Sequence, residues 1–319
     1  MLHPDLLVGT ETGDAAAEWR RSDGRALVAT VDFFAPIVDD AATWGSIGAA
    51  NSASDVYAMG GEPMFALNVV AWPRDLLPLE LLGAVLAGAA ATAADGGWVI
   101  AGGHTVDGPE PMFGQVVIGE LPIGAEPLTN VGARAGDVLV LTKALGTGLV
   151  ATALKRSDVD AAAPGGPLHV AYRAAVASMT RLNAAAARAA RRAAGNAGTD
   201  VTGFGLAGHL HKVLVASEVS ARISLSALPV LPGVDALLAE GFVPGGTHRN
   251  LDFVGDALRG GDERARLLVA DPQTSGGLLV SCAASSAEAL VAQLVADGQA
   301  AAIIGEVTRG DAGVIVLDA

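Results

Sequence analysis

Aspartates that end apolar strands or open helices are the first candidates for chemistry in this sequence. Asp32 interrupts the apolar run ALVATVDFF, and Asp55 lies in the segment SASDVYAMGG. Burying an unpaired carboxylate is costly, so we expect such an aspartate at a strand's end, facing a cation. Carboxylates that converge repel one another and favour divalent cations, and oxygen ligands suit Mg²⁺ that bridges to phosphates. The pattern indicates a site for a metal-bound polyphosphate.

A single aspartate also has structural explanations. Asp55 could instead be a residue inside a helix that forms an ion pair with an arginine. For Asp39 and Asp40 we favour turn or helix-cap chemistry, in which the side chain accepts from nearby backbone N–H groups. Asp14, in TGDAAA, is a further candidate of the same kind. Convergence of several carboxylates in the fold distinguishes a metal site from these alternatives.

Four glycine-flanked polar segments form a second class of candidates. They are AGGHTVDGPEP (101–111), DVTGFGLAGHL (200–210), PGGTHRN (244–250) and DPQTSGG (271–277). Glycine lets the backbone approach a ligand closely, and exposed N–H groups in a turn or at a helix N-terminus can hold an anion. Arg249, in the third of these segments, is a candidate for holding a phosphate.

The two best-known nucleotide loops are missing from the sequence. No GxxxxGK followed by Ser or Thr occurs, and no GxGxxG lies between a strand and a helix; ALGTGLV, which comes nearest, has no third glycine. The sequence therefore predicts that any bound nucleotide is held by aspartates, metal and glycine turns.

Alternating apolar runs and helix-length segments predict an α/β framework for these residues. In the first half we expect strands at 26–34, 64–72, 98–103 and 113–121, and helices at 43–59 and 79–94. In the second half we expect strands at 137–143, 220–228, 264–270, 276–283 and 301–307, and helices at 146–155, 169–194 and 285–296. The stretch 121–136 is rich in Pro and Gly without periodicity, so it reads as a linker. We expect two domains, 1–125 and 126–319.

Composition excludes several classes of protein. The 319 residues are 51% hydrophobic, enough for a folded core, and their charges sum to −14. A surface of that charge repels phosphate backbones, so we expect no nucleic-acid partner. The most apolar stretch, 81–100, is interrupted by Asp95 and two glycines, and no basic n-region precedes an apolar segment at the start, so we expect neither a membrane span nor a secretory signal.

The sequence contains one cysteine, Cys282, in the strand-like run LLVSCAA. This excludes an intramolecular disulfide framework and a cysteine-rich zinc site, and it is compatible with a reducing cytosol. Because nothing nearby supplies a positive, exposed setting, we expect an inert core thiol. The protein is expected to be cytoplasmic.

Six segments, taken in order, resemble one family of enzymes. TVDFFAPIVDD, NSASDVYAMGGEP, AGGHTVDGPEP, DVTGFGLAGHL, PGGTHRN and DPQTSGGLL are similar to those of the selenophosphate synthetases, or selenide, water dikinases. The resemblance extends from about residue 5 to the C-terminus. It implies the two-domain α/β fold of the aminoimidazole ribonucleotide synthetases, usually in a homodimer whose N-terminal sheets form a shared barrel, with a C-terminal synthetase-like domain. Members convert ATP, selenide and water into selenophosphate, AMP and phosphate with Mg²⁺ and a monovalent cation such as K⁺.

The resemblance also implies roles for individual residues. The implied nucleotide-binding positions are Thr12, Gly13, Asp14, Asp32, Asp55, Gly103, His104 and Thr105. Asp55 and Asp200 are the implied Mg²⁺ ligands. These assignments agree with the acidic balance, because carboxylates recruit the metal and the metal neutralises the triphosphate.

Two departures from the family pattern affect the expected activity. The family's N-terminal loop carries a catalytic cysteine or selenocysteine and a lysine three residues later, and this sequence shows neither, so no catalytic residue is assigned. Ala15 also stands where the family usually has a second aspartate; Asp14 or Glu18 are partial substitutes. We expect binding of ATP and Mg²⁺ with little turnover.

One hypothesis for the absence of the loop is a gene start placed downstream of a UGA selenocysteine codon, and the upstream DNA tests it. An engineered truncation is another hypothesis.

Two further functions stay open. A non-catalytic nucleotide-binding paralogue is favoured by Ala15 and by the missing loop, whereas retention of Asp32, Asp55 and Asp200 speaks against it. The other alternative is a different ATP-using member of the superfamily, such as a small-molecule kinase. Competition with thiamine phosphate or an aminoimidazole precursor would identify the latter.

Overall fold

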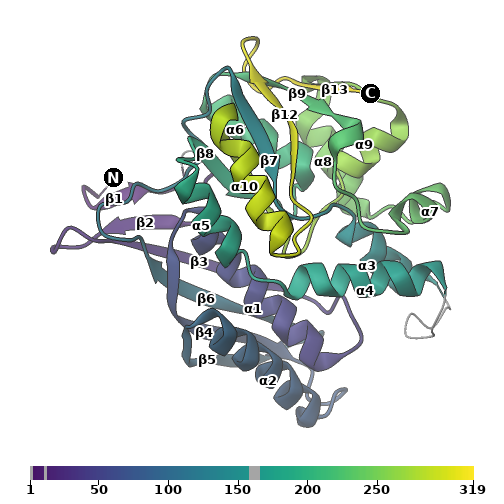
Figure 1. The fold of residues 1–319 in the computed structure, drawn as a ribbon. Coiled ribbons are helices and arrows are strands. Elements are labelled where there is room, and N and C mark those ends of the chain that lie inside the picture. The colour runs from purple at the N-terminus through teal and green to yellow at the C-terminus, as the bar shows by residue number, and fades with distance from the viewer. Residues whose placement is uncertain (1–2, 11–12, 158–165) are drawn as a thin grey trace. The chain divides into compact units, whose positions relative to one another are not determined.

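The computed structural model describes residues 3–10, 13–157 and 166–319, and these form two compact units. The first unit comprises Met1–Pro127 together with Met179–Ala184, and the second comprises Leu128–Ser178 together with Ala185–Ala319. Each unit combines a mixed sheet with helices, so the expected α/β class is confirmed (Figure 1).

The first unit is a six-stranded sheet with two long helices. Its strands are Leu6–Val8 (β1), Ala17–Arg20 (β2), Ala26–Phe34 (β3), Glu62–Trp72 (β4), Val99–Asp107 (β5) and Met112–Glu120 (β6), in the order β1-β2-β3-β6-β4-β5. Its helices are Ala41–Ala58 (α1) and Leu79–Gly96 (α2). Neighbouring strands are antiparallel, except that β4 and β5 are parallel and joined through α2. Asp40 caps α1 by accepting from the N–H of Thr43 at 2.8 Å, which confirms the expected cap.

One face of this sheet is covered by α1 and α2, and the other is open (Figure 1). Side chains alternate along β3, so Val28 is buried on the helix side while Val31 and Phe33 are 54% and 51% exposed on the other side. Register extends the same division to the next strands: Val31 pairs with Val116, which pairs with Leu67. We call the side that carries Val31, Phe33 and Leu67 the open face.

Glycines bring α1 and α2 into close contact. A Cβ on Gly45 would lie 1.9 Å from the carbonyl oxygen of Val85, and one on Gly88 would lie 1.9 Å from that of Ala42. Helix α2 is long and apolar enough to pass a membrane-span test on length and composition. Its packing on α1 identifies it as a core helix of the first unit.

The change Gly88→Ala is expected to lower the free energy of unfolding by roughly 1–3 kcal/mol, because the added methyl group forces the two helices apart. Thermal denaturation measures the loss. Gly83→Ala, in the same helix, is the control, because a Cβ there meets nothing within 4 Å. Equal stability of the two variants would contradict the close packing.

The second unit is a seven-stranded sheet with helices on both faces. Its strands are Asp137–Leu141 (β7), Ala197–Asp200 (β8), Ser220–Ser224 (β9), Leu258–Gly260 (β10), Leu278–Ala283 (β11), Ala302–Thr308 (β12) and Ile315–Asp318 (β13), in the order β10-β13-β9-β12-β7-β11-β8. Its α-helices are Thr147–Arg156 (α3), Pro167–Thr180 (α4), Ala184–Arg192 (α5), Gly205–Ala216 (α6), Val234–Ala239 (α7), Gly245–Val254 (α8), Glu263–Val269 (α9) and Ala284–Ala296 (α10). Short 3₁₀ turns lie at Leu225–Ala227 (η1) and Gly255–Ala257 (η2).

The larger core of the second unit lies between its sheet and α6. Leu139, Leu141 and Leu279 pack there against Leu210 and Leu214. Alternate residues of the same strands face the other way, toward the side on which α10 packs (Figure 1). Cys282 is fully buried in β11, and burial raises the pKa of its thiol to about 11, with Asp137 adding to the effect. The expectation of a core thiol is confirmed, and the raised pKa is typical of an unreactive one.

Two of the expected elements were wrong. The run 264–270, read as a strand, is helical as far as Val269, the last residue of α9. The Asp262 carboxylate caps this helix by accepting from the Ala265 N–H at 2.8 Å. The expected single helix over 169–194 is two helices, α4 and α5. The chain breaks between them at Asn183, whose buried side chain donates to the Ser54 hydroxyl at 2.9 Å.

Candidate nucleotide and metal site

The first unit brings Asp32 and Asp55 together between β3 and α1. Asp32 accepts a 3.0 Å hydrogen bond from the Asn51 amide, and Asp55 accepts one of 2.5 Å from the Thr30 hydroxyl. Thr30 and Asp32 share a face of β3, while Asn51 and Asp55 are one turn apart on α1. We call these four residues the β3–α1 cluster. Two half-buried carboxylates in such proximity form a centre of negative charge that suits a cation.

Further hydrogen bonds fix the backbone around the β3–α1 cluster. The Ser52 hydroxyl donates to the Asp32 carbonyl oxygen at 3.0 Å and accepts from the Gln115 N–H at 3.0 Å. The Gln115 side chain in turn donates to Asn68 at 2.9 Å. These bonds tie α1, β3, β6 and β4 together, so the two carboxylates are held on rigid elements.

A pocket of about 700 Å³ opens where β2 has stopped pairing with β3, between the segment before β2 and the sheet. Ala29, Val31 and Val116 line it from the open face, together with Gly13, Asp14 and Ala15. Thr30, whose hydroxyl donates to Asp55 on the helix side, also lines it, so the pocket and the cluster meet at Thr30 but lie mainly on opposite sides of β3. Thr12 lies outside the described residues. A volume of this size is ordinary for a small-molecule site.

Gly103 and Thr105 lie on the helix side of the sheet, at its far edge. Register pairs Asp32 with Gln115, Gln115 with Asn68 and Asn68 with Gly103 in one row across four strands. Three strand spacings amount to roughly 14 Å. Gly103 has φ +155°, and a Cβ there would lie 2.3 Å from the Asn68 carbonyl oxygen, so this position requires glycine.

His104 lies on the opposite side of the sheet from Asp32. It pairs with Val69, Val69 pairs with Gly114, and Gly114 pairs with Phe33 on the open face. The segment that begins AGGHTVD, a candidate for a ligand-binding turn, belongs instead to β5, which extends from Val99 to Asp107. Within one copy of the first unit, His104 and the β3–α1 cluster therefore do not face one another.

Asp200 and Lys143 lie at one edge of the sheet in the second unit. Strands β7 and β8 are both antiparallel to β11, so their carboxyl ends meet at the same edge. Asp200 ends β8 and is 2% exposed, while Lys143 follows β7 and is 3% exposed. The Lys143 ammonium donates to the Ser275 carbonyl oxygen at 2.8 Å. A buried carboxylate and a buried ammonium thus lie among glycine-rich loops.

Those loops are joined by hydrogen bonds between residues far apart in sequence. The Gln273 N–H donates to the Thr202 carbonyl oxygen at 2.9 Å. The Asn250 amide donates to the Gly203 carbonyl oxygen at 3.0 Å and to that of Ala270 at 2.9 Å. The three segments 200–210, 244–250 and 271–277, which the sequence singled out separately, therefore form one structure.

The segment 271–277 caps a helix and does not hold an anion there. The Gln273 side-chain oxygen accepts from the Gly146 N–H at 3.0 Å and from the Thr147 N–H at 3.2 Å. The Asp271 carboxylate accepts from the Gly148 N–H at 3.1 Å. These oxygens occupy the N-terminus of α3, where an anion would otherwise bind. The N-terminus of α3 is therefore not open to an anion.

Two titratable groups of this region have shifted pKa values. Burial raises the pKa of Asp271 to about 7, although hydrogen bonds from Gln273, Leu149 and Gly148 favour the carboxylate. Burial lowers the pKa of His209 to about 3, and Lys212 adds to this shift. The neutral His209 accepts from the Thr202 N–H at 3.1 Å through Nε2, which fixes the loop after Asp200.

Sequence reasoning missed several residues of both sites. Two of them could have been found from spacing. Thr30 lies two residues before Asp32 on a strand, and Asn51 lies four residues before Asp55 on a helix, so each shares a face with its aspartate. Lys143 and Gln273 gave no such signal, because their partners are more than 120 residues away.

Two family models match the chain. The AIR synthase related protein N-terminal domain matches residues 13–121, and the AIR synthase related protein C-terminal domain matches residues 134–318. Proteins named selenide, water dikinase are similar over nearly the whole chain. The one from Burkholderia pseudomallei is 46% identical over 99% of this chain and 88% of its own length. The chain belongs to the selenide, water dikinase family. The family's protein from Myxococcus xanthus is 45% identical over 98% of this chain and 88% of its own length.

Solved structures share the fold at lower identity. A thiamine-monophosphate kinase from Stenotrophomonas maltophilia is 20% identical, with a TM-score of 0.71 over 99% of this chain and 92% of that one. The hydrogenase maturation protein HypE in complex with ATP is 19% identical, with a TM-score of 0.69 over 99% of this chain and 86% of that one. This chain therefore shares its fold with a thiamine-monophosphate kinase and with HypE.

Glu18 does not belong to the pocket beside the β3–α1 cluster. That pocket is lined by Asp14 and Ala15, whereas Glu18 lines a different cavity. The partial substitution of a missing ligand at position 15 by Glu18 is therefore not supported by the structure.

Proposed function

We propose that this protein makes selenophosphate from ATP, selenide and water, with AMP and phosphate as the other products. The observation that carries the proposal is the 46% identity to a selenide, water dikinase over 99% of the chain, with Asp32 and Asp55 side by side on rigid elements. The chain spans 88% of the length of that relative.

The charge and donor set of the β3–α1 cluster fits Mg²⁺. Mg²⁺ usually takes one or two carboxylates and completes its shell with phosphate oxygens and water. Among the described residues, no group of three His, Cys, Asp or Glu is placed to hold an ion alone. Asp55 would hold the metal in the first unit and Asp200 in the second. Bound there, Mg²⁺ would neutralise the charge that develops on the phosphates.

The proposed nucleotide contacts fall into two groups. Asp32 and Asp55 lie at one end of the helix side, with the backbone of Gly103 and Thr105 at its far edge. Gly13 and Asp14 line the pocket that meets the cluster at Thr30. Thr12 and His104 keep their proposed roles by resemblance. Thr30 and Asn51 are positioning residues, because each holds a carboxylate in place through one hydrogen bond.

The open face supports a homodimer. Val31, Phe33 and Leu67 are exposed and contiguous across β3, β6 and β4, and β5 is an unpaired edge among the described strands. Exposed apolar surface of this kind marks an interaction site. A second copy that packs on this face would bury these residues, and His104 lies on the same side.

The change Phe33→Glu is expected to convert the dimer to a monomer, because it places a charge in the apolar centre of the open face. Light scattering after gel filtration gives the mass. Leu76→Glu is the control, since Leu76 is 76% exposed outside the sheet. A Phe33→Glu protein that remains dimeric would assign the dimer to another surface.

The remaining assignments follow from the family. Residues 1–125 form the proposed nucleotide, metal and dimerisation domain, and residues 126–319 form the synthetase-like domain. A monovalent cation such as K⁺ and a cytoplasmic location are part of the proposal.

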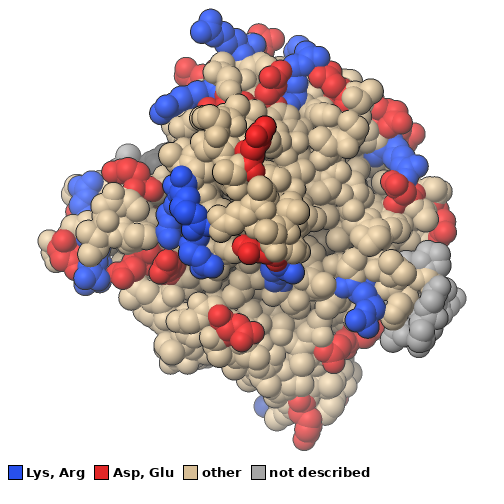
Figure 2. Space-filling model, in the orientation of Figure 1, with Lys and Arg blue, Asp and Glu red and all other residues tan. Residues whose placement is uncertain are grey.

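The face shown in Figure 2 carries acidic and basic side chains interspersed, without an extended patch of one sign.

The test is product analysis with ATP, Mg²⁺ and selenide. Formation of AMP and phosphate that depends on selenide supports the proposal. Binding of MgATP with little turnover matches the expectation from the sequence, and an upstream reading frame without a Cys–Lys pair would then favour a nucleotide-binding paralogue. Formation of ADP from ATP with thiamine phosphate as acceptor, and no response to selenide, would instead identify a small-molecule kinase.

A further inference from the structure

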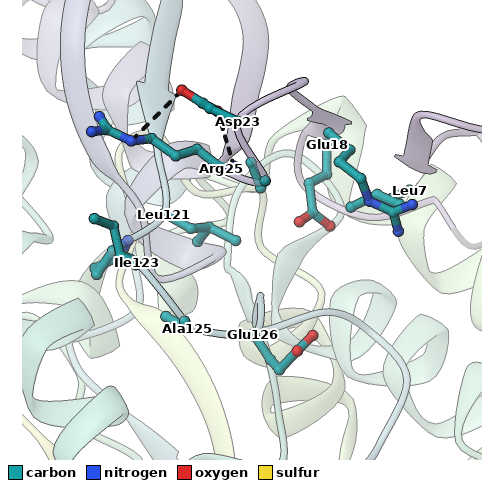
Figure 3. Close-up of a pocket in the computed structure, with 13 residues that line it drawn as sticks. Leu7, Glu18, Asp23, Arg25, Leu121, Ile123, Ala125 and Glu126 are labelled. Carbon is teal, nitrogen blue, oxygen red and sulfur yellow. Dashed lines mark hydrogen bonds and ion pairs between the residues drawn. The ribbon is translucent and has the colours of Figure 1, made fainter.

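A second cavity, of about 500 Å³, lies at the other end of the first unit's sheet. It lies between the turn that joins β2 to β3 and the segment that follows β6 (Figure 3). Leu7, Leu121 and Ile123 supply apolar wall, and Glu18 and Glu126 supply carboxylates. The residues that line it are separate from those of the pocket beside the β3–α1 cluster.

Glu18 is the unusual residue of this cavity. It is 3% exposed, because it pairs with the buried Val28 while its neighbours Ala17 and Trp19 point to the other side of β2. Among the residues that the structure describes, none forms a hydrogen bond or an ion pair with its side chain. Burial, and after it Glu126, raises the pKa of Glu18, whereas Arg20 lowers it. A buried carboxylate that no described residue hydrogen-bonds or pairs with destabilises the empty protein.

The other charges in the cavity are largely neutralised by one another. Asp23 lies 3.2 Å from Arg21 and 3.9 Å from Arg25, and Arg25 lies 3.4 Å from Glu120. Arg20 also lines the cavity and acts on Glu18, so Glu18 and Glu126 together leave an excess of one negative charge there. Figure 3 shows both reaching into it, with Leu121 and Ile123 along the wall. Two such carboxylates favour a positively charged ligand.

The lining favours an organic cation over a metal ion. No group of three His, Cys, Asp or Glu within the described part of the chain is placed to hold a metal. An ammonium group offers three donors that two carboxylates can share, and an alkyl chain matches the apolar wall. A cavity of about 500 Å³ accommodates a small molecule of this kind.

We propose that this cavity binds a small primary amine, whose ammonium group lies between Glu18 and Glu126 and whose alkyl chain packs on Leu121 and Ile123. This is a binding site distinct from the nucleotide and metal site, and its loss would leave the proposed activity as it is. Glu18 acts as the main anchor because it is the more deeply buried of the two carboxylates.

The test is titration of the 319-residue protein with 1,4-diaminobutane and n-butylamine, followed by calorimetry and by the melting temperature. We expect saturable binding of at least one amine and no effect of 1-butanol or KCl at equal concentration. Glu18→Gln should weaken amine binding at least tenfold, and Glu126→Gln should weaken it by a smaller factor. Glu110→Gln is the matched control, because Glu110 is exposed and does not line the cavity.

Stability without ligand provides a second readout. Since no described residue forms a hydrogen bond or an ion pair with the Glu18 carboxylate, Glu18→Gln is expected to melt at the same or a higher temperature than the wild type. A lower melting temperature would reveal a structural partner for Glu18 and overturn the proposal. Failure of both amines to bind, binding of Mg²⁺ or K⁺ at this cavity instead, or unchanged affinity in Glu18→Gln would overturn it as well.

Discussion

Replacing Asp55 by asparagine is expected to lower the affinity of the protein for MgATP by roughly 10- to 100-fold. A hydrogen bond or metal contact to a charged group contributes about 1.5–3 kcal/mol, and 1.4 kcal/mol corresponds to a factor of ten. Asparagine keeps the shape of the side chain, and its carbonyl oxygen still accepts from the Thr30 hydroxyl. The change therefore removes the charge and leaves the β3–α1 cluster in place.

Calorimetric titration with MgATP measures this effect, and AMP formation in the presence of selenide is the second readout. Asp95→Asn serves as the control, because Asp95 is exposed on α2. The melting temperature of Asp55→Asn should stay near that of the wild type. An affinity within twofold of the wild type would remove Asp55 from the metal site and weaken the proposed function.

The second large effect concerns Asp271, whose folded pKa of about 7 lies above its ordinary value of 3.8. Between these two pH values the folded protein binds more protons than the unfolded protein. The free energy of unfolding therefore falls as the pH rises from about 4 to 7. Three pKa units correspond to a loss on the order of 4 kcal/mol.

Asp271→Asn removes this titration. We expect the variant to match the wild type near pH 4 and to exceed its stability at pH 8, because the buried site no longer ionises. Urea denaturation at several pH values gives the difference between the two proteins. Asp252→Asn, an exposed aspartate on α8, should show no such difference. If the free energies of unfolding of the wild type and of Asp271→Asn differ by the same amount at pH 5 and at pH 8, the raised pKa is contradicted.

Local pattern in the sequence was sufficient for most elements of the first unit. The strand ALVATVDFF and the helices that follow it lie close to their expected bounds, because alternation and helical periodicity act over a few residues. Asp32 and Asp55 were recognisable as a potential site from their positions at a strand and a helix. The error at 264–270 shows the limit, since a short apolar run fits a strand and a capped helix equally well.

The sequence by itself determined the family, the α/β class and the carboxylates of the first unit, because motif order and short-range periodicity are properties of neighbouring residues. Only the tertiary structure decided that His104 lies on the other face from Asp32, since one residue of register reverses the direction of a side chain in a sheet. The same holds for Gln273, which caps α3 across more than 120 residues, and for Glu18, whose burial depends on strand pairing. Contacts between distant segments form only when the chain has folded, so the local sequence carries no sign of them.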